Sequence, residues 1–315
     1  MNKHTLAVIM PNYNHAQYIG EALDSILTQS FRPATVLVID DGSDDNSIEV
    51  IERFIAKDSV ISLLRNEVNS GAVFSVNKGL KHISEDYVYV AAADDIILPG
   101  LFEKSMNLLN KYPHAAICCS DTKTIWQSGQ GDTVNKRGLG DKSCYISPEE
   151  LVKIMQKKIV YLSGFGTIIK RKELLETGMP AELKWCGDRI YALTIALRYG
   201  LCYIPEMLAA QLRRKDSYSE QGQRNRKEHK QVIENILELL KKPQYADVLF
   251  KFKKSCALAS LGMPMLRVLF FSPKHRDYLS FNLMRLILWS EFKNAVGAYI
   301  PVVIKKIYRS LAKNR

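Results

Sequence analysis

The stretch VYVAAADDIILPG, residues 88–100, combines a buried-strand pattern with two adjacent acidic residues, Asp94 and Asp95. Six apolar residues precede the pair, and a second apolar run follows it. Neighbouring carboxylates repel each other unless a cation lies between them, and hard divalent ions such as Mg2+ and Mn2+ select oxygen ligands. The pair therefore indicates a metal-binding loop at a strand end, or two carboxylates that cap the following turn.

The residues before this stretch alternate between strand and helix patterns. Apolar runs predict strands at 6–10, 34–40, 60–66 and 86–93, and amphipathic spacing predicts helices at 16–29, 47–58 and 74–84. In the first helix Ile19, Leu23, Ile26 and Leu27 form one apolar stripe. This order is typical of an α/β protein with a mostly parallel central sheet and helices on both faces.

Polar residues follow three of these strands. In parallel sheets ligands bind at the carboxyl ends of the strands, so these loops are predicted to converge on one edge: Tyr13 and Asn14, Asp40 and Asp41, and Asp94 and Asp95. A carboxylate at this edge can accept hydrogen bonds from a nucleobase or a ribose hydroxyl. Asp44 to Ser47 have the composition of a helix start and are expected to do no more than that.

The second half of the chain has fewer clear signals. Four glycines between residues 129 and 140 predict an exposed, mobile loop. Helices are expected after Ser147 as N-cap and over 187–199, where Gly200 suits the C-terminal cap. We divide the chain into a donor-binding half at 1–115, an acceptor-binding and base-supplying half at 116–221, and a helical C-terminal region at 222–315.

Composition limits the classes of function. The 315 residues are 47% hydrophobic with a net charge of +11, which excludes a disordered chain. Six cysteines without CxxC spacing favour reduced thiols, and His15, His82 and His114 show no shared metal spacing. No nucleic-acid-binding motif, signal peptide or run of about 20 apolar residues is visible. We expect a cytoplasmic protein, with attachment to the inner face of the membrane as an alternative.

Four motifs together resemble inverting glycosyltransferase family 2, which has the Rossmann-like GT-A fold. They are PNYNHAQYIGEALDSILTQSF, VLVIDDGSDDNS, NSGAVFSVNKGL and DYVYVAAADDIILPG, in this order, and the resemblance covers about residues 5–220. It implies sugar transfer from a nucleotide diphosphate donor, most commonly a UDP-sugar, with inversion at the anomeric carbon. It also implies a divalent cofactor, Mn2+ or Mg2+, and a saccharide or lipid-linked saccharide acceptor, as in bacterial cell-surface polysaccharide synthesis.

The resemblance assigns roles on the donor side. Asp41 would hold the base, Asp94 would lie near the ribose and Asp95 would bind the metal. The remaining nucleotide-binding candidates are Pro11, Tyr13, Gly71 and Asn77, of which Gly71 would permit close backbone approach. Relatives often carry a further Asp where this chain has Ala92, so the metal geometry here departs from the family pattern.

On the acceptor side the resemblance makes Asp188 the catalytic base. The family's Glu-Asp pair corresponds to Gly187 and Asp188, so one carboxylate is missing here, and an N-cap role is the structural alternative for Asp188. Arg213 or Arg214 would contact the diphosphate, since arginine suits bidentate phosphate binding, or would be solvated surface residues. Trp185 would stack on an acceptor sugar or serve packing.

The C-terminal region mixes large apolar residues with Lys and Arg. This pattern predicts an interfacial amphipathic helix on an anionic membrane, or helices packed on the core or on another subunit. Two other functions stay open at this level. A sugar-phosphate nucleotidyltransferase also needs an acidic metal site, and a receiver-like signalling module has an acidic pocket, although it would end near residue 120.

Overall fold

The computed structural model describes residues 4–126, 131–213 and 222–296. Its first half is a parallel sheet in which β1 lies between β2 and β4 and β2 pairs with β3. The strands are β1 (Leu6–Asn12), β2 (Thr35–Asp40), β3 (Ile61–Arg65) and β4 (Tyr87–Val90). Each is joined to the next by a helix, which is the arrangement that the alternating sequence pattern predicts.

The same sheet continues into the second half through an antiparallel strand. β9 (Thr167–Lys170) lies between β4 and β6 (Ile117–Trp126), and β6 pairs in parallel with β10 (Leu201–Arg213). Short antiparallel strands complete it: β5 (Ile96–Ile97) and β8 (Cys144–Ile146) on β10, and β7 (Thr133–Asn135) on β6. The predicted α/β class with a mostly parallel sheet is confirmed.

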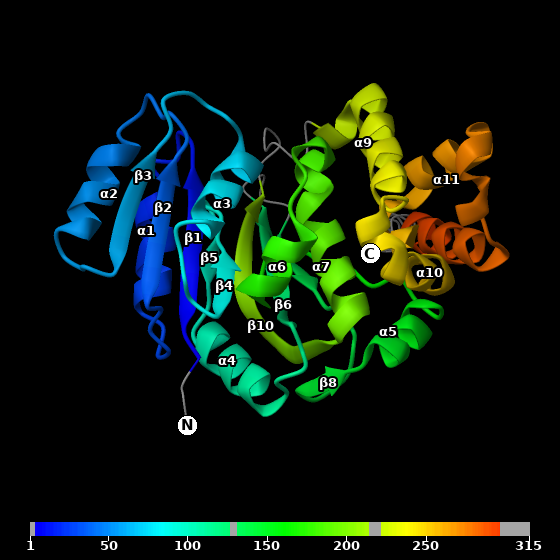
Figure 1. Cartoon of the computed structure of the whole chain (residues 1–315), viewed down its shortest axis with the longest axis horizontal. Coiled ribbons are helices and arrows are strands. Elements are labelled where there is room, and N and C mark those ends of the chain that lie inside the picture. The colour runs from blue at the N-terminus through cyan, green and yellow to red at the C-terminus, as the bar shows by residue number, and fades with distance from the viewer. Residues whose placement is uncertain (1–3, 127–130, 214–221, 297–315) are drawn as a thin grey trace, which may run out of the picture.

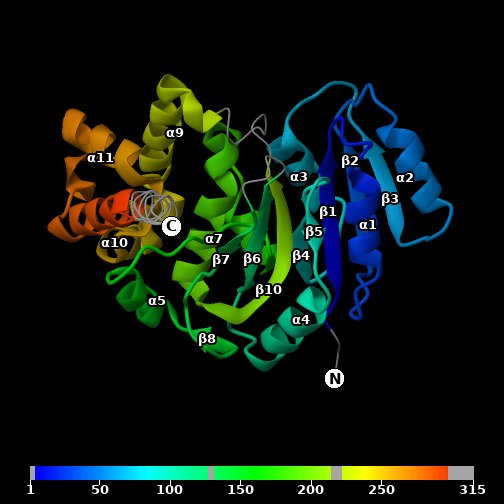
Figure 2. The same ribbon diagram turned by 180° about the vertical axis from the view of Figure 1, so that it is seen from behind.

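Helices cover both faces of the sheet (Figures 1 and 2), and β1 is therefore buried on both sides. Leu6, Val8 and Met10 pack on one face, and Ala7 and Ile9 pack on the other. The first face carries α1 (Ile19–Leu27), α2 (Ser47–Ile55) and α4 (Leu101–Lys111), and the second carries α3 (Ala72–Leu80), α6 (Arg171–Thr177) and α7 (Gly187–Tyr199). A fully apolar strand is what such two-sided burial requires.

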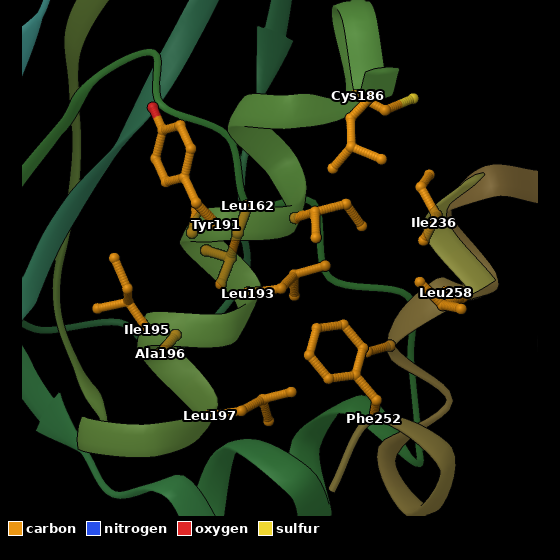
Figure 3. Packing of buried hydrophobic residues seen from close by; sticks show 14 of the residues in the cluster. Leu162, Cys186, Tyr191, Leu193, Ile195, Ala196, Leu197, Ile236, Phe252 and Leu258 are labelled. Atoms are coloured by element: carbon orange, nitrogen blue, oxygen red, sulfur yellow. The ribbon is translucent and has the colours of Figure 1, made fainter. Parts of the chain in front are cut away.

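The C-terminal helices gather beside α7, at the end of the molecule away from β3 (Figure 1). They comprise α9 (Arg226–Leu239), α10 (Ala246–Ser255), α11 (Gly262–Phe271) and a helical stretch at 281–296, with 3-10 turns at η2 (Pro243–Tyr245), η3 (Ala257–Leu261) and η4 (Pro273–Tyr278). Figure 3 shows Leu193 and Leu197 of α7 facing Phe252 and Leu258. These helices therefore share the core of the sheet domain, as one of the alternatives predicted.

Helix α5 (Pro148–Met155) begins as the sequence predicts. The Ser147 hydroxyl accepts a hydrogen bond from the Glu150 N–H, and the Glu150 carboxylate accepts one from the Ser147 N–H, which makes a capping box. Gly200 follows α7 with φ of 74°, a left-handed conformation that suits glycine.

The glycine-rich segment is exposed, as predicted, over its described part except at Arg137 and Leu139, but it is not an irregular loop throughout. Within its described part, β7 pairs with β6, and the Arg137 side chain is buried at 8% exposure. Composition suggested a loop because glycines are frequent there, but an arginine that bonds to main-chain carbonyls fixes the segment.

Among the described residues, no single helix has the length and apolar composition to cross a bilayer. One pair, Pro243–Ser255 and Ala257–Phe271, meets both conditions only when taken together, across a 71° bend.

Candidate functional site

The loops after β1 and β2 lie against each other at the carboxyl edge of the sheet. The Asn12 side-chain amide donates to Asp40 Oδ1 at 2.9 Å and to Ser43 Oγ at 3.2 Å. The Ala16 N–H donates to Asp45 Oδ2 at 2.9 Å. The predicted convergence is therefore present. Asp45 also binds the neighbouring loop, so the expectation that Asp44 to Ser47 only begin a helix is wrong.

Asp40 and Asp41 have different surroundings. Asp40 is fully buried and accepts from Asn12 and from Ser43, which shapes the turn. Asp41 is 2% exposed and accepts hydrogen bonds from the Asn66 side chain at 2.7 Å, the Ser70 N–H at 3.0 Å and the Gly71 N–H at 2.7 Å. Asp41 thus holds the 66–71 loop beside β2.

Gly71 begins α3 with φ of 90°, and a Cβ there would meet no heavy atom within 4 Å. The backbone conformation, and not a close approach of protein atoms, requires glycine at this position. By contrast, a Cβ on Gly79 would lie 2.7 Å from the Ile39 Cδ1 atom, so Gly79 allows α3 to pack closely on the sheet. The Asn77 amide of α3 donates to the Met179 carbonyl at 2.9 Å and ties the two halves together.

The acidic loop at 94–95 is bound to β10. Asp95 is 8% exposed, and its Oδ1 accepts the Leu212 N–H at 3.2 Å. Directly after it, β5 pairs with β10 at Ala209 and Ala210. Leu212 precedes Arg213 at the end of β10, so the acidic loop is joined to the backbone next to a cation from a distant part of the sequence.

Asp94 and Arg213 border this point. Asp94 is partly exposed, and its Oδ2 lies 3.9 Å from His15 Nε2. Arg213 ends β10 with its guanidinium 5.3 Å from the Trp126 ring centre. Arg214 lies outside the described residues. His15 gave no signal in the sequence analysis, because its contact with Asp94 arises only when the β1 and β4 loops meet.

Asp188 lies in the first turn of α7, after the 3-10 turn η1 (Ala181–Cys186). One carboxylate oxygen accepts the Gly164 N–H at 3.1 Å, and the other accepts the Arg189 N–H at 2.7 Å. Burial raises the pKa of Asp188 above the ordinary value, and these N–H groups and the charge of Arg189 only partly oppose it. A carboxylate with a raised pKa is a stronger proton acceptor than an exposed one.

Two buried tyrosines, Tyr89 and Tyr191, are electrostatic neighbours of the site carboxylates. Burial raises the pKa of Tyr89, and the Asp95 carboxylate raises it further. Burial likewise raises the pKa of Tyr191, with further contributions from Asp188 and Tyr89. Each of the two carboxylates thus raises the pKa of one buried tyrosine.

Arg137 is a site residue that the sequence analysis missed. Its guanidinium donates to the carbonyls of Ser120, Tyr161 and Phe165 at 2.6, 2.7 and 2.8 Å. The 161–165 segment contains Gly164, whose N–H binds Asp188, and the positive charge of Arg137 also lowers the pKa of Asp188. No motif marks such a residue, since its partners are main-chain carbonyls.

The other sequence candidates occupy mixed environments. Pro11 is partly exposed at the end of β1, and Tyr13 is 41% exposed. Trp185 is partly buried, contacts the Gly222 backbone and lies 6.1 Å edge-on from the His229 ring. Trp185 lies two residues after Leu183, just before α7, and packs against the C-terminal region.

The acidic loop can hold a divalent ion only if a bound diphosphate supplies further ligands. Within the ranges that the structure describes, no three His, Cys, Asp or Glu side chains are grouped as a metal site. Mg2+ is commonly held by one or two carboxylates together with substrate phosphates. Asp94 and Asp95 supply oxygen donors of that kind, so these residues fit an ion that a diphosphate completes.

The fold and this edge are those of α/β proteins that bind ligands at the carboxyl ends of their strands. The sequence comparison then identifies the family. Residues 7–176 match the family model described as glycosyl transferase family 2, and the chain belongs to this family.

Curated relatives share part of the chain. An uncharacterized glycosyltransferase of Haemophilus influenzae is 36% identical over 109 residues, 35% of this chain and 44% of that protein. The glycosyltransferase GlyG of Streptococcus pneumoniae is 31% identical over 98 residues, 31% of this chain and 33% of that protein. The matched region thus spans less than half the length of these relatives.

Solved structures share the fold. S. aureus TarS 1-349 in complex with UDP-GlcNAc has a TM-score of 0.66 at 19% identity, over 90% of this chain and 84% of that chain. The mannosyltransferase PcManGT of Pyrobaculum calidifontis, in complex with GDP-Man and Mn2+, has a TM-score of 0.54 at 17% identity, over 94% and 88%. These likenesses support the GT-A fold.

Proposed function

We propose that this chain is an inverting glycosyltransferase that moves a sugar from a nucleotide diphosphate sugar to a hydroxyl of a glycan or lipid-linked saccharide. The observation that carries the proposal is the pairing of two carboxylates at one edge of the sheet. Asp95 accepts the Leu212 N–H at the end of β10, and the partly buried Asp188 accepts the N–H of Gly164, two residues before Gly166, which faces Ala209 of β10. Family membership favours this function over a nucleotidyltransferase or a receiver-like module.

The donor would lie over the loops of the first half. Pro11 and Tyr13 would line the nucleoside pocket together with the 66–71 loop, which Asp41 holds in place. Asp41 would also contact the base, Asp94 would approach the ribose, and Gly71 and Asn77 would border the donor from α3. UDP is the first candidate nucleotide, and dTDP and GDP remain to be tested against it.

The diphosphate would lie between Asp95 and Arg213. Asp95, with Asp94, would hold a Mn2+ or Mg2+ ion, which would supply charge neutralisation to the leaving diphosphate. Arg213 would add a direct contact, because a guanidinium can donate two parallel hydrogen bonds to phosphate oxygens. The interaction of Asp95 with Leu212 N–H fixes the carboxylate relative to this arginine.

Asp188 would act as the base. It would take the proton of the acceptor hydroxyl while the acceptor oxygen bonds to the anomeric carbon and the bond to the diphosphate oxygen breaks. Direct displacement of this kind inverts the anomeric carbon and leaves no covalent enzyme intermediate. The Gly164 and Arg189 N–H groups orient the carboxylate for this step.

An acceptor sugar would approach Asp188 from the side of Tyr161. This tyrosine is 53% exposed, and the Arg189 guanidinium lies 5.9 Å from its ring centre. An exposed aromatic ring next to the base offers a stacking surface for a sugar, whereas Trp185 is engaged in packing. An acceptor linked to lipid would agree with a role in bacterial cell-surface polysaccharide synthesis at the inner membrane face.

A nucleotide-binding assay tests the proposal. Thermal unfolding would be followed with UDP-, dTDP- and GDP-sugars, with and without Mn2+, for the wild type, Asp95→Ala and the exposed control Asp24→Ala of α1. A bound nucleotide at 100 times its Kd stabilises the fold by about 2.7 kcal/mol. We expect one nucleotide to raise Tm with Mn2+ in the wild type and the control, and Asp95→Ala to lose the metal-dependent part. No shift with any nucleotide and metal would refute the donor assignment.

A further inference from the structure

The positive charge of this protein belongs to its C-terminal part. Residues 222–315 contain 19 Lys or Arg and six Asp or Glu, a net charge of +13. Residues 1–221 contain 25 Lys or Arg and 27 Asp or Glu, a net charge of −2. The sheet domain is therefore nearly neutral, and the cationic character comes from the helices beside α7 and the sequence that follows them.

The helical stretch at 281–296 has two apolar faces. Leu283, Leu286 and Ile287 are at most 4% exposed and pack in the core. A second set of apolar residues is 37–79% exposed and recurs at helical spacing; we call it the aromatic stripe, and it consists of Phe281, Leu288, Trp289, Phe292 and Val296. The exposed set therefore lies outside the described core.

Cations are interleaved with the aromatic stripe. Arg285, Leu288, Trp289 and Phe292 line a shallow hollow of about 470 Å³. The Trp289 and Phe292 rings are stacked with centres 5.6 Å apart, and Lys293 Nζ lies 5.3 Å from the Trp289 ring centre. Residues 297–315, directly after this helix, add five Lys or Arg and no Asp or Glu to the sequence.

We propose that the aromatic stripe is a docking surface for an anionic lipid bilayer. Exposed Trp, Phe and Leu enter the boundary between headgroups and acyl chains, and neighbouring Lys and Arg bind the anionic headgroups. The charge argues against a second copy as the occupant. In a symmetric dimer across the stripe, Arg285 and Lys293 of both copies would lie in one interface, where like charges repel.

The docking surface goes beyond the proposed transferase function and does not depend on it. It involves no residue of the acidic edge, and binding to vesicles needs no nucleotide or acceptor. Failure of the donor assay would therefore leave this proposal intact, and failure of the vesicle assay would leave the transferase assignment intact.

Vesicle co-sedimentation of the full chain is the test. Vesicles of phosphatidylcholine alone would be compared with vesicles that also contain phosphatidylglycerol, at low and high salt. The variant Trp289→Ser with Phe292→Ser removes two rings of the stripe, and Leu175→Ser of α6, 42% exposed, is the matched control for loss of exposed apolar surface. Circular dichroism and Tm would verify folding of each variant.

We expect binding to the anionic vesicles that weakens with salt, and a loss of at least about tenfold in the double variant but not in Leu175→Ser. Three results would overturn the proposal. They are equal binding to both vesicle types, unchanged binding of the folded double variant, and a dimer in light scattering that the double variant converts to monomer.

Discussion

The carboxyl edge of the sheet buries polar side chains, whereas the aromatic stripe exposes apolar ones. At the edge, polar groups are buried and bound to one another: Asp41 accepts three N–H groups, and Asp188 accepts two. On the stripe, apolar groups are exposed and border cations. Both arrangements cost free energy in the isolated chain, since buried charge is desolvated and exposed apolar surface orders water.

The fold compensates for buried charge and for exposed apolar surface in different ways. The edge is fixed by hydrogen bonds from several elements, so its carboxylates keep one geometry, and burial raises the pKa of Asp188, as a reacting site requires. The stripe is one face of a helix. The unfavourable free energy of its apolar surface in water is relieved only when another surface covers it. The comparison therefore separates a region built for chemistry from a region built for contact.

The largest expected effect is on turnover in Asp188→Asn. We expect the transfer rate to fall by about 10²–10⁴, because the amide cannot accept the acceptor proton. Cys186, not Asp188, is the N-cap of α7, and the pH dependence of stability separates the role as base from a purely structural role in the first turn. The folded pKa of Asp188 is raised, so the ionised carboxylate destabilises the fold as pH rises above about 4, the ordinary range of Asp.

The check is to measure Tm of the wild type and of Asp188→Asn between pH 4 and 8. As pH rises, the Tm of Asp188→Asn should increase relative to that of the wild type, because the asparagine of the variant does not ionise. A constant difference, or a rate within threefold of the wild type, would mean that Asp188 serves only the start of α7.

The next effect in size concerns Arg137. Arg137→Met leaves the carbonyls of Ser120, Tyr161 and Phe165 without their donor, and we expect a loss of about 3–5 kcal/mol in the free energy of unfolding. Removal of this charge should also raise the pKa of Asp188 and move the acidic limb of the rate profile to higher pH.

Denaturant unfolding and a pH–rate profile measure the two parts. The exposed Arg32→Met, which breaks a surface pair with Asp58, is the control and should change stability by less than about 1 kcal/mol. If Arg137→Met folds stably and its acidic limb stays in place, Arg137 is not a positioning residue for Asp188.

A smaller effect is expected at Gly164. A Cβ there would overlap the Tyr191 hydroxyl, so Gly164→Ala should cost about 1–3 kcal/mol by overpacking. Tyr191→Phe removes the overlapping oxygen, and the double variant should be more stable than the sum of the single changes predicts. Strict additivity in denaturant unfolding would show that the two residues do not press on each other.

The fold and the converging loops could be predicted because local patterns determine them. Apolar runs separated by amphipathic helices predicted a parallel sheet, and the carboxyl-end rule predicted that the loops after β1, β2 and β4 converge, which the contacts Asn12–Asp40 and His15–Asp94 show. The pairing of Ser147 with Glu150 was likewise local.

Contacts between distant segments could not be predicted. Nothing in the sequence signals that Arg137 binds carbonyls of residues 120, 161 and 165, or that Asp95 accepts the Leu212 N–H. The same holds for His15 beside Asp94. These interactions depend on strand order in the second half, where antiparallel β9 joins two parallel units and no repeating pattern indicates the topology.

The smallest expected effect is at Leu288, on the exposed face of the 281–296 helix, and Leu286 on the buried face is its comparison. Leu286 is 4% exposed and Leu288 is 53% exposed, so the same Leu→Ala change tests burial two residues apart. Leu286→Ala should cost about 2–5 kcal/mol through cavity formation, and Leu288→Ala should change stability by no more than about 0.5 kcal/mol. Denaturant unfolding without lipid measures both. Equal costs would show that the chain itself covers Leu288, and the stripe would then belong to the core and not to a contact surface.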